Sequence, residues 1–108
     1  MFSNSIINAI VDHAEQGSQI VVITKHAEPI IIQIDNEVYV DSITRISRVN
    51  GQERIEFING AQVTFHRSPA WLRGRTANLV VAPMGLNDDD LISIIPAAKL
   101  GGEIIGYV

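Results

Sequence analysis

The hydrophobic positions near the amino terminus follow a helical period. Apolar side chains recur along one stripe of a helical surface, at Ile6, Ile7, Ile10, Val11 and Ala14. This spacing predicts a helix over residues 4–16. Ser3, Asn4 or Ser5 supplies the capping side chain at its start, and Gly17 ends it.

Three short runs further along the chain predict parallel strands. Residues 19–24 (QIVVIT) and 78–82 (NLVVA) are almost continuously apolar, which is typical of parallel strands covered on both faces. Residues 103–108 (EIIGYV) follow a Gly-Gly turn and predict a third parallel strand. A helix is predicted at 88–99, capped by Asn87 or Asp88, with Pro96 ending or kinking it.

Alternating patterns fill the middle of the chain. Residues 43–49, 53–58 and 61–66 predict strands, and Asn50-Gly51 and Asn59-Gly60 between them are strong hairpin signals. The segment 43–66 is therefore expected to form an antiparallel meander. Residues 30–34 (IIIQI) and 37–40 (EVYV) also look like strands, joined by a tight turn at 35–36, and residues 67–77 look like a loop.

These elements predict one α/β domain over residues 1–108, a small parallel sheet with an antiparallel meander inserted in it. The composition agrees, because 108 residues that are 46% hydrophobic and 19% charged suffice for one core. The absence of cysteine excludes disulfides, thiolate metal sites and thiol catalysis. No apolar run is long enough to span a membrane, and the first residues lack the pattern of a signal peptide, so a cytoplasmic setting is expected.

Charge changes the picture because it is unevenly distributed. The chain carries a net charge of −4, yet residues 45–75 hold six Arg against two Glu. Arg makes bidentate contacts with phosphate or carboxylate groups, so this segment is a candidate surface for nucleic acid or an acidic partner. The alternative is that these cations only offset the acidic flanks. The candidate residues are Arg45, Arg48, Arg54, Arg67, Trp71, Arg73 and Arg75.

Trp71 is included because it lies among three of these cations. An aromatic ring beside guanidinium groups suits stacking on a base or a cation–π contact with a partner. The alternative is that the indole covers an edge of the core.

Other polar groups give weaker signals. Asp88, Asp89 and Asp90 could bind a divalent metal, although helix capping and the helix dipole explain their positions. The three histidines, His13, His26 and His66, share no metal-ligand spacing. Ser68 and Thr24 have no nucleophile motif around them. No cofactor is expected.

Four segments together resemble a known family. They are IINAIVDHAEQGSQIVVIT, the basic hairpin ERIEFINGAQVTFHRSP, the loop and strand LRGRTANLVVAP, and KLGGEIIGYV. In this order they resemble a P-loop ATPase core over residues 4–108. The likeness is nearest to the packaging ATPase (large terminase subunit) of tailed bacteriophages and to related helicase-like motors. Residues 53–82 carry the most specific part of it.

The chain departs from that family where nucleotide chemistry is done. A phosphate loop needs G-x-x-x-x-G-K-[ST] between a strand and a helix. The nearest stretch, PAWLRGRT, lacks the first Gly, has Arg for Lys and leads into a strand. Ala82 and Pro83 stand where the family has the paired acids that hold Mg²⁺ and orient water. The resemblance therefore implies a truncated, degenerate ATPase core without ATPase activity.

The sequence leaves several functions open. The favoured one is a non-catalytic, phage-type accessory or regulatory protein that binds nucleic acid or a phage or host protein through the Arg-rich hairpin and loop. A structural or assembly protein is the alternative, in which a homo-oligomer hides an open sheet edge. The two can coexist, and a homo-oligomer is expected for the binding protein too. An ATPase completed in trans by another chain is the least favoured.

Overall fold

The computed structural model describes the backbone of residues 1–108 and every side chain except those of Val40, Lys99 and Leu100. Six strands form a single sheet in the order β2-β3-β4-β1-β5-β6. The strands are β1 (Gln19–Ile23), β2 (Ile43–Ser47), β3 (Arg54–Phe57), β4 (Gln62–His66), β5 (Ala77–Pro83) and β6 (Ala98–Tyr107). The α-helices are α1 (Asn4–Glu15), α2 (Ala27–Glu37) and α3 (Asp88–Ile94). Three short 3₁₀ helices are η1 (Val40–Ser42), η2 (Pro69–Leu72) and η3 (Ile95–Ala97).

The sheet is mixed, and β4 joins its two parts. β1 pairs in parallel with both β4 and β5, and β5 pairs in parallel with β6. β3 runs antiparallel to β4, and β2 antiparallel to β3. The predicted α/β class and the meander over 43–66 are confirmed. The meander is continuous with the parallel sheet because its last strand is also a parallel neighbour of β1.

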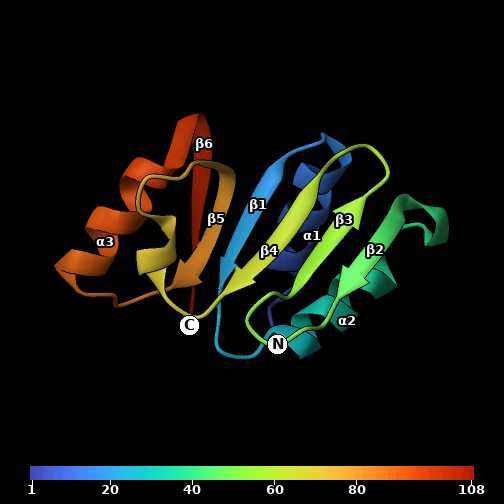
Figure 1. Cartoon of the computed structure of the whole chain (residues 1–108), viewed down its shortest axis with the longest axis horizontal. Helices are drawn as coiled ribbons and strands as arrows, with labels where there is room; N and C mark the ends of the chain where they lie inside the picture. The colour runs from blue at the N-terminus through green and yellow to red at the C-terminus, as the bar shows by residue number, and fades with distance from the viewer.

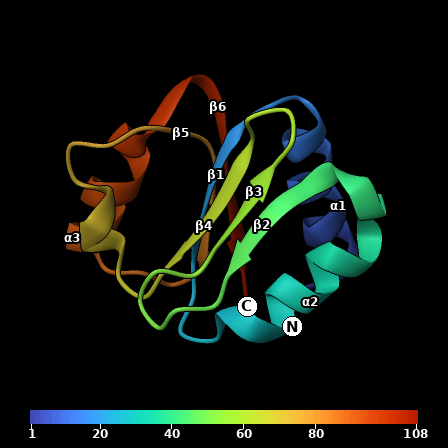
Figure 2. The same ribbon diagram turned by 45° about the vertical axis from the view of Figure 1, so that its right-hand side comes forward.

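The helices cover the two faces of the sheet unequally. α1 and α2 pack on one face against side chains from β1, β3, β4 and β5. α3, η2 and η3 pack on the opposite face, where the buried residues come from β1 and β5. In Figure 2 the sheet stands between α1 and α2 on one side and α3 on the other. On the side of α3, strands β2–β4 are left without a helical cover, as Figure 1 shows toward the viewer.

Helix α1 lies close to its predicted bounds. The Oγ of Ser3 accepts a hydrogen bond from the amide of Ile6 at 3.3 Å, which caps the first turn. The helix ends before Gly17, whose φ of +78° is a left-handed conformation that glycine adopts without steric cost. The buried stripe is Ile7, Ile10, Val11 and Ala14.

The strands predicted at 30–34 and 37–40 are wrong. This segment forms α2 and then η1. Its buried residues, Ala27, Ile30, Ile31 and Ile34, have the spacing of one helical face and pack against the sheet and α1. The β-branched run has strand propensity, but a helix buries four apolar side chains on one face and leaves Ile32 and the acids exposed.

The carboxyl-terminal elements differ from prediction in their bounds. The helix predicted over 88–99 ends at Ile94, and Pro96 lies in η3, consistent with the inability of proline to continue the helix. The last strand starts at Ala98 rather than residue 103, with its register shifted between Ala98 and Glu103. Residues 67–77, predicted as a loop, contain η2 and the first residue of β5.

Candidate interaction surface

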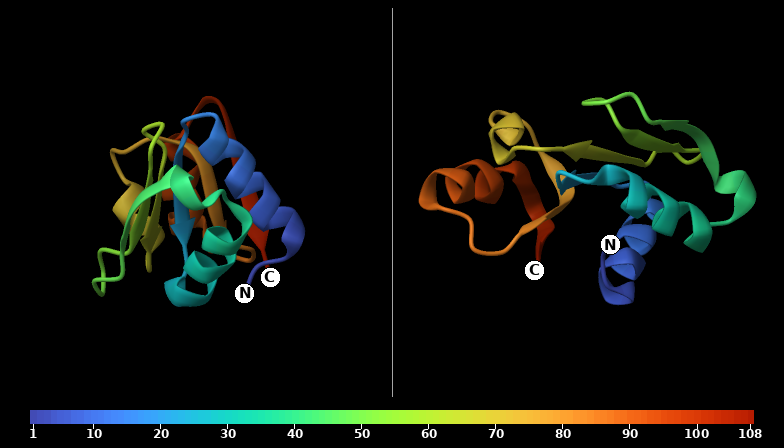
Figure 3. Two further views of the ribbon diagram at one scale, coloured as in Figure 1. Left: turned by 90° about the vertical axis from the view of Figure 1, so that its right-hand side faces the viewer. Right: turned by 90° about the horizontal axis from the view of Figure 1, so that it is seen from below.

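The face of β2–β4 opposite α1 and α2 carries polar and charged side chains. Alternation along β3 turns Ile55 and Phe57 into the core, so that Arg54 and Glu56 point to the other side. The same alternation places Gln62, Thr64 and His66 of β4 on that side, since Val63 and Phe65 are buried beneath α1 and α2. Seen from below, α1 and α2 lie on one side of these strands only (Figure 3, right). We call this the open face.

The strand register sets the order of side chains across the open face. One row runs from Arg45 through Glu56 to Gln62, and the next runs from Ser47 through Arg54 to Thr64. The Nε of Arg54 lies 3.6 Å from a carboxylate oxygen of Glu56. That Nε is buried and has no hydrogen-bond partner among the described side chains. Arg45 is exposed on the edge strand, so its guanidinium is available to a ligand.

Trp71 lies at the border of the open face and is already stacked on both sides. Its indole lies flat against the imidazole of His66, with ring centroids 3.5 Å apart and planes 12° from parallel. The Cζ of Arg75 lies 4.2 Å from the indole ring centroid. Both groups cannot occupy one side of the ring at those distances, so the indole is held between them. The Nη1 of Arg75 also donates to the carbonyl of Trp71 at 2.6 Å.

This stack changes the protonation of His66. Burial and the nearby positive charge of Arg75 lower the pKa of His66 from its ordinary 6.5 to about 4, and Glu53 opposes the shift. The Nε2 of His66 is buried without a partner among the described side chains. At neutral pH the imidazole is therefore uncharged, and the positive charge of the stack is carried by the guanidinium of Arg75.

The structure divides the predicted Arg residues. Arg45 and Arg54 lie on the open face, and Arg75 adjoins it through Trp71. Arg48 instead binds Glu28 of α2 at 2.9 Å, and the Nε of Arg73 donates to Ser93 of α3 at 3.1 Å. Arg67 follows β4 and donates to the side chain of Asn50 at 2.9 Å. The seven candidate residues are thus distributed over several surfaces, a separation that spacing along the chain did not indicate.

A cleft lies at the carboxyl ends of the parallel strands. It has a volume of about 560 Å³, and its lining includes Lys25, His26 and Arg67. Ligands of open α/β sheets commonly bind at this edge. The sequence interpretation missed Lys25 as a candidate because it placed no helix after β1. The sequence does carry a signal for this helix: Pro29 is suited to a first helical turn, and the apolar residues that follow it have the spacing of one helical face.

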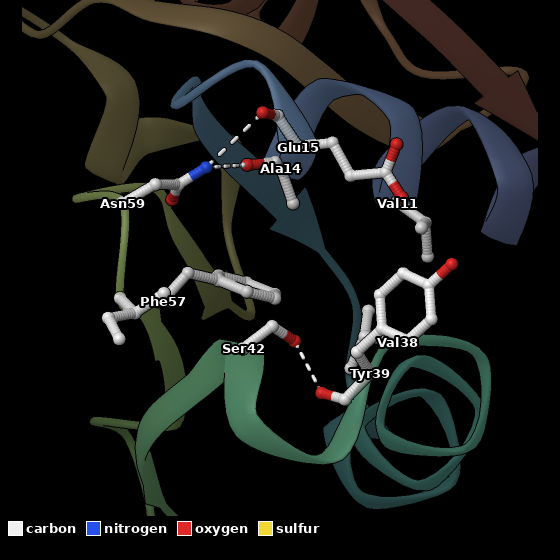
Figure 4. Close-up of a pocket in the computed structure, with 9 residues that line it drawn as sticks. Val11, Ala14, Glu15, Val38, Tyr39, Ser42, Phe57 and Asn59 are labelled. Carbon is white, nitrogen blue, oxygen red and sulfur yellow. Dashed lines mark hydrogen bonds between the residues drawn. The ribbon is translucent and has the colours of Figure 1, made fainter.

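A second hollow lies near the amino-terminal end of β1. It has a volume of about 170 Å³, and its lining is mainly apolar. Figure 4 shows Phe57 and Tyr39 pointing toward it from different elements. Above it, the Nδ2 of Asn59 donates to the carbonyls of Ala14 at 2.8 Å and Glu15 at 3.3 Å. Asn59 thereby supplies a side-chain donor to two carbonyls in the last turn of α1, and the Ala14 carbonyl also accepts from the amide of Gly17 at 3.1 Å.

The remaining sequence candidates have local structural partners. Thr24 accepts from the amide of His26 at 3.2 Å, and Ser68 caps η2 by accepting from Ala70 at 3.2 Å. Asn87 caps α3, and all three Asp residues lie in its first turn. Among the described side chains, no group of three or more His, Asp or Glu is placed to hold a metal ion. His13 lies 3.3 Å from Glu103, in a different part of the molecule from the stacked His66.

No helix in the described chain is both long and apolar enough to cross a membrane. Comparison with protein families, with characterised proteins and with solved structures finds no match to this chain.

Proposed function

We propose that this protein is a non-catalytic binding protein that holds single-stranded nucleic acid on its open face. The observation that carries this proposal is the uncovered β2–β4 surface, on which Arg45 and Arg54 stand among neutral hydrogen-bonding side chains and which the Trp71–Arg75 stack borders. The only acid in the two strand rows is Glu56.

The chemistry of this surface suits a flexible polyanion. Arg45 and Arg75 are exposed and form charge-assisted hydrogen bonds with phosphate oxygens. Ser47, Gln62 and Thr64 offer hydrogen bonds to sugars or base edges. A base stacks on the outer side of the Arg75 guanidinium, because the two sides of the indole are already occupied within the protein. Single strands expose their bases to such contacts, whereas duplexes hide them.

The proposal retains the phage-type accessory role that the sequence resemblance implies. A chain with Ala82 and Pro83 in place of paired acids, and without a phosphate-loop motif, would keep an ATPase-like core as a binding scaffold. It would act in the cytoplasm beside a phage or host nucleic-acid machine. The support for this part lies in the four sequence segments alone.

The test is fluorescence anisotropy with fluorescein-labelled single- and double-stranded DNA over a salt series. The informative variant is Arg45→Ala/Arg75→Ala. The matched control, Arg48→Ala/Arg73→Ala, removes the same charge from side chains bound to Glu28 and Ser93. Loss of two phosphate contacts should reduce the slope of log affinity against log salt by about 1.4 for a single strand. The control should retain the natural slope.

Two outcomes would contradict the proposal. Absence of binding at low salt would exclude a nucleic-acid ligand and leave an acidic protein surface as the partner of the open face. Equal weakening in the informative and control variants would show that binding follows total charge rather than this surface. Circular dichroism of each variant verifies that the fold is intact.

A further inference from the structure

Strand β6 forms one edge of the sheet, and its outer backbone groups have no strand beside them. The amide of Met84 donates to the carbonyl of Tyr107 at 2.7 Å, which shows that Tyr107 faces β5. Backbone groups alternate along a strand, so Ile105 and Glu103 also face β5. The amides and carbonyls of Ile104 and Gly106 therefore point outward from the edge.

The surface around these outward groups is apolar. Ile104 is 46% exposed and Met84 is 65% exposed, and both line a hollow that also includes Leu91 of α3. Met84 lies over Gly106 so closely that a Cβ at position 106 would be 2.7 Å from the Met84 Cγ. The glycine thus gives Met84 its position and leaves the strand without a side chain there. On this face of β6, the Ile104 side chain therefore projects next to a position, Gly106, where the strand has no side chain and Met84 covers the backbone.

We propose that two copies of the chain pair through β6, antiparallel, about a two-fold axis at Ile105. In this register each Ile104 exchanges both backbone hydrogen bonds with Gly106 of the second copy. The Ile104 side chain then lies opposite a position that has no side chain and packs on the exposed Met84 of the other copy. The two copies of Ile105 meet at the axis on the opposite face. The sheets of the two copies become one continuous sheet.

The geometry favours a second copy of β6 over pairing with the other edge, β2. In a two-fold arrangement the Ile104 side chain of each copy lies over Gly106 of the other copy. The same segment therefore supplies both contacting surfaces. β2 has an irregular register between Ile43 and Arg45, with Thr44 and Arg45 exposed. The register shift of β6 lies between Ala98 and Glu103, so residues 103–107 pair regularly with β5. Irregular register and charge are devices that protect an edge from pairing. Over residues 103–107 the charged side chain is Glu103, which is held by His13 on the α1 side.

The test is sedimentation velocity over a concentration series up to about 1 mM, the weak end of specific association. The natural protein should shift toward twice the mass of one chain as concentration rises. Ile104→Lys should remain monomeric because a lysine would be buried against the partner's Met84. Ile92→Lys is the matched control, since Ile92 is 67% exposed on α3 and lines a different hollow. It should dimerise like the natural protein.

Amide hydrogen exchange identifies the strand that pairs. The amides of Ile104 and Gly106 should exchange at least about tenfold more slowly at the highest concentration than in the dilute protein or in Ile104→Lys. A monomer at every concentration would overturn the proposal. So would a dimer that Ile104→Lys leaves intact, or one in which these two amides gain no protection. The result is independent of nucleic-acid binding, because β6 lies at the opposite edge of the sheet from β2.

Discussion

The imidazole of His66 and the indole of Trp71 are stacked, with their centroids 3.5 Å apart. His66 ends β4, and Trp71 lies in η2, which leads toward β5. This contact fixes the loop against the sheet and places Arg75 on the far side of the indole. One aromatic pair therefore couples the protonation of His66, the position of the loop and the charge at the border of the open face.

The low pKa of His66 predicts a pH-dependent stability. Its pKa of about 4 in the folded chain lies below the ordinary 6.5, so the unfolded chain binds more protons between these values. The contribution of the uncharged His66 to the free energy of unfolding is fully present above about pH 6.5. It decreases as the pH falls from there to about 4. Urea unfolding from pH 7 to 4 measures this slope. In His66→Phe, which keeps a ring against Trp71, the slope should be shallower; an unchanged slope would contradict the assignment.

The charges beside His66 predict opposite shifts in two variants. Arg75→Ala removes a cation that lowers the pKa of His66, so that pKa should rise toward its ordinary value. Glu53→Gln removes an acid that raises it, so the pKa should fall further. An NMR titration of the imidazole protons measures both. Arg48→Ala is the control, because its guanidinium is bound to Glu28, and it should leave the titration unchanged.

Asn59→Ala should destabilise the fold by about 1–2 kcal/mol, since it leaves carbonyls at the end of α1 without their side-chain donor. The Asn59 Nδ2 donates to Ala14 at 2.8 Å, and its Oδ1 accepts from the amide of Ala61 at 3.0 Å. Asn8→Ala is the control, because Asn8 is exposed on α1 and alanine favours a helix. Chemical unfolding of both variants provides the comparison. Equal stability of the two would show that the Asn59 contacts contribute nothing.

Two neighbouring isoleucines distinguish the helix α2 from the strand that the local pattern suggests. Ile31 is 0% exposed, so Ile31→Ala should cost about 2–5 kcal/mol through lost burial and a cavity. Ile32 is 47% exposed, so Ile32→Ala should change the free energy of unfolding by about 0.5 kcal/mol or less. Thermal or urea unfolding measures both. In a strand over 30–34, alternation would group Ile32 with Ile30 and Ile34 on one face, and the order of the two effects would be reversed.

Much of the architecture could be predicted because local patterns and tertiary contacts agree there. The two Asn-Gly turns and the alternation in β3 and β4 located the meander, since a turn with left-handed glycine and one buried face leaves few alternative registers. The apolar stripe of α1 and the apolar runs of β1 and β5 likewise located these three elements. Residues 30–34 were mispredicted because a run of isoleucines suits both a buried strand and a buried helical face, and only packing against α1 and the sheet distinguishes them.

The candidate site was less predictable than the fold. Sequence placed six Arg and Trp71 in one segment, and tertiary structure separated them according to which neighbour each side chain meets. Arg48 and Arg73 are bound to α2 and α3, which lie far from them in the chain. The stacking of Trp71 on His66 depends on the path of the chain between β4 and η2, which no residue period encodes.

The class of fold, the meander, the positions of most elements and the lack of cysteine follow from residue type and from spacing within a few residues. Contacts between distant segments make 27–37 a helix, join the meander to the parallel strands through β4, and leave one face of β2–β4 uncovered. The same contacts lower the pKa of His66 and leave β6 at an edge of the sheet. Each of these depends on what packs against a segment from elsewhere in the chain, where burial and hydrogen bonding outweigh local preference.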